Sequence, residues 1–586
     1  MKKTKIVCTI GPASESKETL KTLMLSGMNV ARLNFSHGSH EEHRARIESI
    51  KEVRENLGLP VALMLDTKGP EIRLGDFDVD EVELKEGDFY TLSMDPSVRG
   101  DEKRASVSYA GLANDVKVGS TILIDDGLVE LTVEKIDENG EILTLVKNNG
   151  IIKGHKGVNV PDVKTSLPAI TEKDKSDLIF GIEQGIDFVA ASFIRKAQDV
   201  FEIRRILEEN GGASVRIISK IENREGVDNI AEILSASDGI MVARGDLGVE
   251  IPAEEIPLIQ KHIVRMCNEV GKNVIIATQM LDSMQRNPRP TRAEVTDVAN
   301  AILDGTDAIM LSGETAAGKY PELAVKTMAK IAVNVEESSS FKEMVLRREH
   351  WSESHTSNAI SEASCRLAKE LGASAILCPT TGGSTARAIS KYRPEVPVIA
   401  ATYDEDVRRS LALTWGVESV ITEMVKSTDA VIESAISTAF REEKVSEGDL
   451  IVITAGIPAG VSGTTNMIKV HTVGNVLTRG LGLGKKSVCG KAVIGSTVDE
   501  LEDRFEDGDI LVARQTEVDM IEYMKRASAI IVEEGGLTSH AAIVALSLEI
   551  PTIIGAKEAT VKIKKGEIVT VDPNSGLIYS GCMKAL

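Results

Sequence analysis

Residues 215–226 read VRIISKIENREG. The stretch begins as an apolar, β-branched run typical of a strand, and it ends with Lys220 two residues before Glu222. Side chains alternate between the two faces of a strand, so the cation and the anion point the same way. The next predicted strand, at 239–248, also ends in a carboxylate, Asp246. Two charged strand tips in succession predict a site on the rim of a sheet.

The chain around this stretch alternates strands with amphipathic helices. Three predicted strands precede residue 70 and five follow residue 168, which makes eight. Eight parallel strands alternating with helices predict a (β/α)8 TIM barrel over 1–69 and 169–340, with its chemistry at the carboxyl ends of the strands. Nearly every strand ends in polar side chains, namely Arg32, Asn34, Asp66, Ser192, Lys220, Glu222, Asp246, Thr278, Ser312 and Glu314.

Three further α/β or all-β parts are predicted. Residues 70–168 combine short strands with recurrent glycine turns, which indicates an all-β lid domain inserted after the third barrel strand. Residues 340–355 read as a linker helix, and 341–473 show the pattern of a doubly wound α/β regulatory domain. Residues 474–586 are predicted to form a small extra domain of short strands around one helix, which starts at GGLTSHAA.

Composition narrows the class of protein. A net charge of −21 argues against a nucleic-acid partner, because nothing neutralises a phosphate backbone in bulk. No apolar run approaches the ~18 residues of a membrane span, and the N-terminus lacks the apolar region of a signal peptide, so a cytoplasmic location is expected. The six cysteines form no C-x-x-C pair, which predicts neither a disulfide framework nor a zinc site.

The charged strand tips indicate their own chemistry. Glu222 and Asp246 offer oxygen ligands of the kind that Mg²⁺ or Mn²⁺ prefers, with positions left open for a substrate. Lys220 is then a fixed positive charge for a phosphoryl group or an enolate. A simple surface salt bridge between Lys220 and Glu222 remains the alternative.

Long motifs connect these residues with a known family. They run in order from residue 5 to about 321, and they are KIVCTIGPAS, MNVARLNFSHGSHEEH, MLDTKGPEIR, DFVAASFIR, ISKIENREG, VARGDLGVEI, ATQMLDSMQRNPRPTRAE and IMLSGETAAGKYP. On these motifs the chain resembles the pyruvate kinases, and the resemblance extends more weakly to about 473. It implies transfer of the phosphoryl group of phosphoenolpyruvate to ADP in glycolysis, giving pyruvate and ATP. It also implies a homotetramer.

The resemblance implies roles at the barrel mouth. Lys220 would neutralise the phosphoryl group in transfer, Arg32 would hold its oxygens, and Glu222 and Asp246 would hold Mg²⁺. Thr278 would belong to the proton relay that turns enolpyruvate into pyruvate. The amides around Gly245 and Asp246 would bind the substrate carboxylate. The nucleotide would contact Asn34, Ser36, His37, Arg73 and Lys156, the last supplied by the lid.

A potassium site follows from the same resemblance. Its ligands would be Asn34, Ser36, Asp66 and Thr67, which are hard oxygen donors suited to an alkali cation. Glu71 is the residue that accompanies K⁺ dependence in the family, so K⁺-stimulated turnover is expected.

Two sequence patterns resemble ligand-binding motifs but lack a residue or spacing that the motif requires. The stretch GETAAGKY at 313–320 nearly matches a phosphate-binding loop, but Tyr320 stands where the Mg²⁺-binding hydroxyl is required. His37, His40 and His43 recur every three residues, yet they straddle a loop and a helix start and do not form the zinc motif H-E-x-x-H. A metal at these histidines is therefore not favoured.

The two C-terminal parts carry one candidate site each. The loop TTGGSTARAIS places hydroxyls and glycine amides before a helix, where the family binds an activating sugar phosphate, through Thr380, Thr381, Gly383, Ser384 and Thr385. A plain tight turn is the alternative there.

The stretch GGLTSHAAIVALSLEIPTIIGA resembles the phosphohistidine domain of phosphoenolpyruvate-utilising enzymes, with His540 as the phosphorylated residue. Leu546 replaces an arginine usual in those enzymes, and no ATP-activating domain is present, so a structural, assembly or regulatory role is favoured.

Two other functions compete with the kinase. A barrel lyase or aldolase would use Mg²⁺ enolate chemistry with Lys220 as a base or Schiff-base residue. A binding or regulatory protein would have lost catalysis, but every catalytic position that the resemblance implies is filled.

Overall fold

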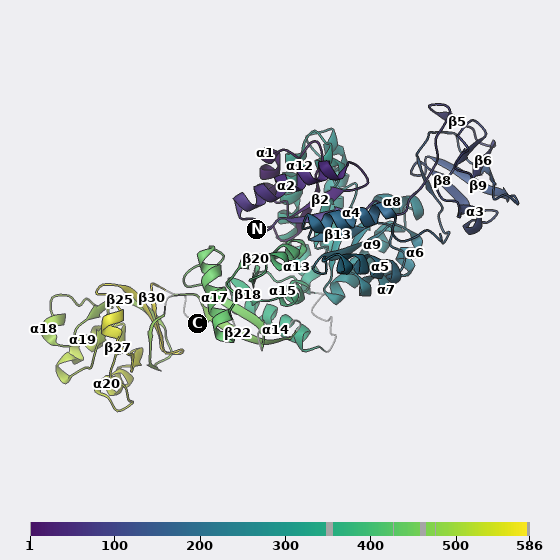
Figure 1. Cartoon of the computed structure of the whole chain (residues 1–586). Helices are drawn as coiled ribbons and strands as arrows, with labels where there is room; N and C mark the ends of the chain where they lie inside the picture. Colours follow the sequence, from purple (N-terminus) through teal and green to yellow (C-terminus); the bar gives the residue numbers. More distant parts are fainter. Residues whose placement is uncertain (1, 347–354, 426, 458–463, 475, 583–586) are drawn as a thin grey trace. The chain divides into compact units, whose positions relative to one another are not determined.

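The computed structural model describes residues 2–346, 355–425, 427–457, 464–474 and 476–582. These residues form two compact units (Figure 1). One unit joins residues up to 353 with 387–393 and 404–419, and the other contains 354–386, 394–403 and 420–586. Within the described ranges, no helix has both the length and the apolar character needed to cross a membrane.

The first unit contains a closed barrel of eight parallel strands, in the order β1-β17-β16-β15-β14-β13-β3-β2. Sequence neighbours are thus spatial neighbours, and the carboxyl ends of all strands meet at one rim. The predicted TIM barrel is confirmed. Its strands are β1 (Lys5–Thr9), β2 (Val30–Asn34), β3 (Ala62–Asp66), β13 (Phe188–Ala191), β14 (Arg216–Ile221), β15 (Gly239–Ala243), β16 (Asn273–Ala277) and β17 (Ala308–Leu311).

Helices surround the barrel because each buries one apolar face against the outward side chains of the strands. Ser16 and Ser39 cap two of them, each accepting a hydrogen bond from a first-turn amide. The helices of this part are α1 (Lys17–Ser26), α2 (His40–Leu57), α4 (Glu172–Glu183), α5 (Ala197–Glu209), α6 (Arg224–Asp228), α7 (Ile230–Ala236), α8 (Arg244–Glu250), α9 (Ile256–Val270), η1 (Asp282–Gln285), α10 (Arg292–Asp304), α11 (Gly313–Ala316), α12 (Pro321–Glu336) and α13 (Ser339–Leu346). The last helix covers part of the predicted linker helix, whose residues 347–354 lie outside the described ranges.

The opposite end of the barrel is closed by a later segment. Helix α16 (Glu405–Ser410) leads into η2 (Leu411–Leu413), and Leu413 packs in the apolar cluster inside the barrel. Asn273, the first residue of β16, donates to the Leu413 carbonyl at 3.4 Å. The segment formed by α16 and η2 therefore covers the amino-terminal ends of the strands. It leaves uncovered the opposite rim, where the strands end in polar side chains.

The inserted domain is all-β apart from one short described helix, α3 (Leu112–Asp115), as predicted. A seven-stranded sheet has the order β4-β12-β8-β9-β10-β6-β7, and β11 pairs with β5. The strands are β4 (Ile72–Arg73), β5 (Val82–Leu84), β6 (Phe89–Ser93), β7 (Arg104–Ser106), β8 (Thr121–Ile124), β9 (Val129–Ile136), β10 (Ile142–Val146), β11 (Gly150–Ile152) and β12 (Gly157–Asn159).

The second unit begins with an α/β sheet in the order β20-β19-β18-β21-β22. Strand β18 pairs in parallel with β19 and β21, and β22 runs antiparallel to β21. The elements are α14 (Thr356–Glu370), β18 (Ala375–Pro379), α15 (Ser384–Ser390), β19 (Val398–Thr402), β20 (Val417–Ile421), α17 (Thr428–Arg441), β21 (Leu450–Gly456) and β22 (Thr465–Thr472).

The last domain has an eight-stranded sheet in the order β23-β30-β29-β25-β26-β27-β28-β24. The helix expected near GGLTSHAA is α20, but the prediction of one helix is wrong, because four short helical segments accompany it. The elements are β23 (Val476–Arg479), β24 (Leu481–Leu483), β25 (Val488–Ile494), α18 (Val498–Leu501), β26 (Ile510–Ala513), η3 (Val518–Met520), α19 (Ile521–Arg526), β27 (Ala529–Val532), α20 (His540–Leu548), β28 (Thr552–Ile554), α21 (Ala559–Lys562), β29 (Ile568–Asp572) and β30 (Leu577–Ser580).

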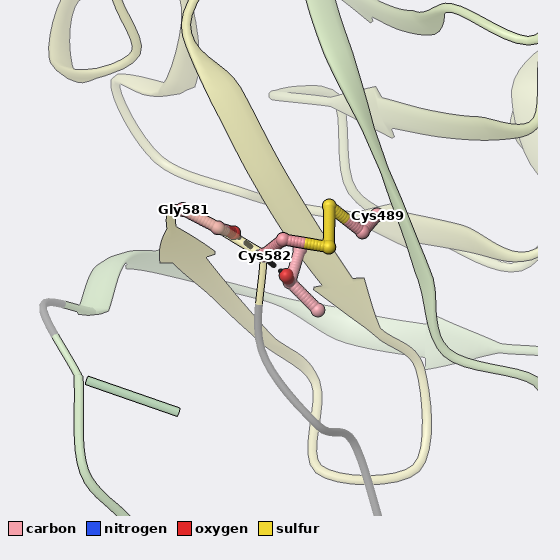
Figure 2. The surroundings of a disulfide bond; sticks show 4 residues. Cys489, Gly581 and Cys582 are labelled. Carbon is pink, nitrogen blue, oxygen red and sulfur yellow. Dashed lines mark hydrogen bonds between the residues drawn. A yellow bond between two sulfur atoms is a disulfide. The ribbon is translucent and has the colours of Figure 1, made fainter. Parts of the chain in front are cut away.

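A disulfide in this domain corrects the expectation drawn from cysteine spacing. Figure 2 shows Cys489 bonded to Cys582, with their Cα atoms 5.3 Å apart. Strand β29 pairs with β25 on one side and β30 on the other, so residues 93 positions apart in sequence are brought together. Spacing along the chain shows no such pairing, because it is set by the order of strands in the sheet.

Candidate active site

Strand β14 points Lys220 and Glu222 toward the barrel mouth. Ile218, two residues earlier, belongs to the apolar cluster inside the barrel, whereas Ile217 and Ile221 pack outward against the helices. Alternation therefore directs Lys220 and Glu222 inward. Lys220 Nζ lies 2.9 Å from Glu222 Oε1, and both residues are buried, at 8% and 1% exposure. The pair exists, but the surface salt bridge considered above is excluded by its burial.

Asp66 binds both cations of the site. Lys220 Nζ lies 3.2 Å from Asp66 Oδ1, and Arg32 Nε donates to Asp66 Oδ2 at 2.6 Å. Lys220 also donates to Ser192 Oγ at 2.8 Å. Burial opposes ionisation of Asp66, but Arg32 and Lys220 outweigh it and lower the pKa of the carboxyl. Charges from strands β2, β3 and β14 thus form one buried network, as such groups must when water is excluded.

Glu222 is held in place from two sides. Its Oε2 accepts a hydrogen bond from the Phe193 amide at 2.6 Å, while Oε1 faces Lys220. Burial raises the pKa of Glu222 to about 7, against the opposing charge of Lys220 and with added repulsion from Asp246. A cation bound next to this buried carboxylate would favour its ionised form and lower its pKa.

Asp246 is not on a strand tip, contrary to the sequence-based expectation. Strand β15 ends at Ala243, and Asp246 lies in the first turn of α8. The glycine and acidic residues that follow the strand continue directly into a helix instead of an extended tip. The charge of Asp246 still acts on both Glu222 and Lys220, so the two carboxylates belong to one site.

The donor set fits a hard divalent cation. Across the described part of the chain, no three His, Cys, Asp or Glu side chains converge as a metal site. Two carboxylates with room for substrate oxygens match the way Mg²⁺ is bound in phosphoryl-transfer enzymes. Glu222 and Asp246 are therefore the residues that would hold such an ion.

Thr278 lies at the end of β16 with a backbone conformation that side chains rarely adopt. Its φ is +69°, and that of Gln279 is +55°. The Thr278 hydroxyl accepts a hydrogen bond from the Gly245 amide at 2.7 Å and donates to the Ala277 carbonyl at 2.6 Å. The structure thus joins two of the predicted residues, Thr278 and Gly245.

Arg244 maintains this arrangement and was missed in the sequence. Its Nη2 donates to the Thr278 carbonyl at 2.8 Å, and its guanidinium pairs with both oxygens of Asp297 at 2.7 Å. An arginine directly before Gly245 and Asp246 was a readable signal, but its partner Asp297 lies on α10, far along the chain.

A cavity of about 520 Å³ lies between the inserted domain and the barrel mouth. Its lining includes Arg73, Lys156, Phe193 and Asp246. Arg73 pairs with Glu71 at 2.6 Å, and Lys156 Nζ lies 2.9 Å from Asp125 Oδ1. The two cations predicted for nucleotide phosphates therefore share a cavity with one of the metal carboxylates. The other residues predicted for the nucleotide, Asn34, Ser36 and His37, do not line it.

The predicted potassium ligands gather at the ends of β2 and β3. Asn34 is the register partner of Asp66, and its side-chain oxygen accepts from the Ser36 amide at 3.1 Å. Thr67 Oγ1 accepts from the Ser192 amide at 3.0 Å. Asp66 is also the residue that holds Lys220 and Arg32, so this corner is physically continuous with the barrel-mouth network.

In the second unit, the hydroxyls of the predicted effector loop line a cavity of about 270 Å³. Thr380, Thr381, Ser384 and Thr385 contribute to it, together with Glu423 and other residues. Thr380 Oγ1 accepts from the Gly383 amide at 3.0 Å, and Gly383 has φ of +77°, which favours glycine. The loop is therefore a tight turn that also borders a cavity.

His540 begins helix α20, which Ser539 caps. Its Nδ1 lies 2.9 Å from Thr516 Oγ1. Leu546, at the position where an arginine is usual in the phosphohistidine enzymes, is exposed at 55%.

Comparison with known proteins agrees with this arrangement. Residues 1–325 match the model of the pyruvate kinase barrel domain, 358–471 that of the pyruvate kinase alpha/beta domain, and 505–576 that of the mobile domain of PEP-utilising enzymes. The chain is 54% identical over 581 residues to a pyruvate kinase of Geobacillus stearothermophilus, covering 99% of each protein. It is 52% identical over 587 residues to that of Staphylococcus saprophyticus, covering 100% of each.

A solved structure extends the agreement to three dimensions. The crystal structure of a pyruvate kinase from Cryptosporidium parvum superposes with a TM-score of 0.76 at 40% identity, covering 80% of this chain and 96% of that one. Together with the full-length relatives, this shows that the chain belongs to the pyruvate kinase family and is a phosphotransferase.

Proposed function

We propose that this chain transfers the phosphoryl group of phosphoenolpyruvate to ADP in glycolysis, with Lys220 as the central catalytic cation. The observation that carries the proposal is the position of Lys220 Nζ between Asp66 and Glu222 at the barrel mouth. Phosphoryl transfer needs alignment and charge neutralisation rather than a protein nucleophile. A buried network of fixed charges suits that demand.

Lys220 and Arg32 supply the positive charge. Burial disfavours the charge of Lys220, but Asp66 and Glu222 outweigh it and hold its pKa above the usual range. The ammonium therefore stays protonated at neutral pH and faces a site from which water is largely excluded. In such surroundings a preorganised cation stabilises transferring negative charge far better than in water.

Glu222 and Asp246 would hold Mg²⁺ or Mn²⁺, and Asn34, Ser36, Asp66 and Thr67 would hold K⁺. When bound, the divalent ion supplies positive charge to the substrate oxygens. Arg73 and Lys156 would bind the nucleotide phosphates from the side of the inserted domain, as their shared cavity favours. The amides around Gly245 and Asp246 would bind the substrate carboxylate.

Thr278 is proposed to hold the proton that converts enolpyruvate to pyruvate. Its hydroxyl is oriented by the Gly245 amide and the Ala277 carbonyl, and the Arg244 contact supports its strained backbone. To act in the relay, the hydroxyl turns its O–H from the Ala277 carbonyl to the substrate carbon, gives up that proton and takes another from water, while the Gly245 amide keeps its oxygen in place.

A coupled assay for pyruvate formed from phosphoenolpyruvate and ADP tests the proposal directly. Turnover that depends on a divalent cation and rises with K⁺ supports it. Equal activity with only a tetraalkylammonium salt would refute the potassium site. The competing lyase would need a neutral Lys220 amine, which the two carboxylates disfavour; trapping of a substrate on Lys220 by borohydride would favour the lyase.

We propose regulation by a phosphorylated effector at Thr380, Thr381, Gly383, Ser384 and Thr385. The hydroxyl-lined cavity supports it. Ser384→Glu should abolish activation while sparing basal turnover, because the added carboxylate repels a phosphate and the loop is remote in sequence from the barrel site. An unchanged response to phosphorylated sugars and nucleotides in that variant would refute the effector site.

For the remaining parts we propose a homotetramer and a structural, assembly or regulatory role for the last domain. Sedimentation of the full chain measures the first. The cytoplasmic location remains a prediction.

A further inference from the structure

The three regularly spaced histidines have separate tasks in the fold, although they do not form a metal site motif. His37 lies in the exposed loop between β2 and α2. His40 Nε2 lies 2.7 Å from Asp177 Oδ1, and its ring stacks on Phe180 at 4.3 Å. His43 Nε2 lies 2.9 Å from the His37 carbonyl oxygen. Only His43 therefore hydrogen-bonds directly to the loop.

The His43 ring is enclosed beneath that loop. The residue is only 1% exposed, and its ring lies parallel to Phe35, with centroids 3.9 Å apart and an angle of 11°. Phe35 is itself buried and follows directly after β2. The histidine side chain thus presses against the first loop residue and hydrogen-bonds to the third.

The hydrogen bond has a definite direction. A carbonyl oxygen only accepts, so Nε2 carries the proton. The buried Nδ1 has no hydrogen-bond partner among the described residues, which matches the unprotonated nitrogen of a neutral ring. Burial lowers the pKa of His43, with Arg46 acting in the same direction and Asp177 against it.

The start of the loop is fixed independently of His43. The Phe35 amide donates to the Asp66 carbonyl at 3.0 Å, and Lys173 Nζ donates to the Phe35 carbonyl at 2.8 Å. His43 instead holds the carbonyl of His37, further along the loop. Ser36 and His37 donate their amides to Asn34, at 3.1 Å and 3.3 Å, so the loop is tied back to the end of β2. Gly38 then takes φ of +85°, which leaves His37 exposed at the turn. Asp66 and Lys173 therefore anchor the start of loop 35–38, Asn34 holds the next two amides, and His43 holds the His37 carbonyl.

We propose that His43 is a positioning residue, whose Nε2–H holds loop 35–38 in the conformation in which Asn34, Ser36 and His37 serve the potassium ion and the nucleotide. The inference rests on the proposed roles of those three residues. It adds a residue that touches neither ligand and acts only through the backbone of the loop.

The test compares variants that differ in the hydrogen bond. His43→Phe keeps a ring to stack on Phe35 but removes the donor, and His43→Gln restores a donor of similar reach. The control is Glu52→Gln, on the same helix, because Glu52 pairs with Lys17 and not with the loop. Circular dichroism confirms that each variant is folded.

In His43→Phe, the K⁺ concentration for half-activation and the KM for ADP should each rise about fivefold, the scale of one lost hydrogen bond. The KM for phosphoenolpyruvate and kcat at saturating K⁺ and ADP should stay near the wild-type values. His43→Gln should recover part of the loss, and Glu52→Gln should show none of it. Calorimetric titration with ADP, which needs no turnover, should give the same ratio.

Unchanged K⁺ and ADP constants in a folded His43→Phe variant would overturn the inference, as would an equal rise in the KM for phosphoenolpyruvate. If His43→Phe does not fold, His43→Leu replaces it under the same criteria. A wild-type enzyme that ignores K⁺ would overturn the potassium site instead, and the ADP titration would still decide the role of His43.

Discussion

The barrel mouth and the last domain each present one titratable residue that resemblance marks as reactive. Lys220 contacts Asp66, Glu222 and Ser192, which come from or follow three different strands. Among the residues that the structure describes, His540 has one side-chain hydrogen bond, to Thr516. In the first region charges from distant parts of the chain converge, whereas in the second a histidine stands at a helix start with one neutral partner. The assignment of a catalytic role to Lys220 is therefore stronger than the assignment of phosphorylation to His540, because side chains from several strands meet at Lys220.

The largest expected effect lies at the barrel mouth. Lys220→Met removes the buried cation, and kcat should fall about a thousandfold, as when a preorganised charge contact is lost in other active sites. Steady-state pyruvate formation at saturating substrates measures it. Turnover near the wild-type value would show that Lys220 is not catalytic, and its many contacts would then not distinguish it from His540.

The next effect concerns pH and the metal. Protons compete with the divalent ion for Glu222, whose pKa burial raises to about 7. Metal affinity should therefore be constant above that pH and fall by up to about tenfold per unit below it. Titration of Mn²⁺ by electron paramagnetic resonance between mildly acidic and alkaline pH measures the profile. A profile that Glu222→Gln leaves unchanged would contradict the assignment.

A stability effect should be confined to the last domain. The disulfide between Cys489 and Cys582 closes a long loop, and its loss should lower the free energy of unfolding of that domain by about 2–5 kcal/mol. Chemical denaturation of Cys489→Ser measures the shift, with Cys365→Ser, at a cysteine outside the disulfide, as the control. Equal stability of both variants would contradict the role of the disulfide. A large fall in kcat in Cys489→Ser would show that catalysis at the barrel mouth depends on the last domain.

The smallest effect is expected at His540. His540→Ala should leave kcat unchanged, and labelled phosphoenolpyruvate should leave no acid-labile phosphate on the wild-type chain. Label that appears on the wild type and disappears in His540→Ala would make the last domain a phosphocarrier and place it beside the barrel mouth as a second reactive centre.

The sequence predicted those parts of the fold that repeat a strong local pattern. Strand β14 alternates faces as its residues require, so the shared direction of Lys220 and Glu222 was readable. Strands β4 and β7 are only two and three residues long, and they form through pairing rather than local pattern. Asp246 was placed on a strand because an apolar run followed by Gly and Asp does not show where a helix takes over.

Contacts between residues far apart in the sequence were also not predicted. Asp297 binds Arg244 from a different helix, and Cys582, which follows β30, meets Cys489 of β25 although β29 lies between these two strands. His43 was considered only as a metal ligand, since its spacing from His37 is visible and its stacking on Phe35 is not. Contacts of this kind depend on the assembled fold, which spacing along the chain does not encode.

The central claim is that Lys220 serves the phosphoryl group while Glu222 serves the metal. The most direct measurement is Mn²⁺ affinity of Lys220→Met and Glu222→Gln in parallel, at a pH above the Glu222 pKa. Lys220→Met should bind Mn²⁺ about as well as the wild type, and Glu222→Gln should bind it at least about tenfold more weakly. Equal loss of affinity in both variants would contradict this division of labour.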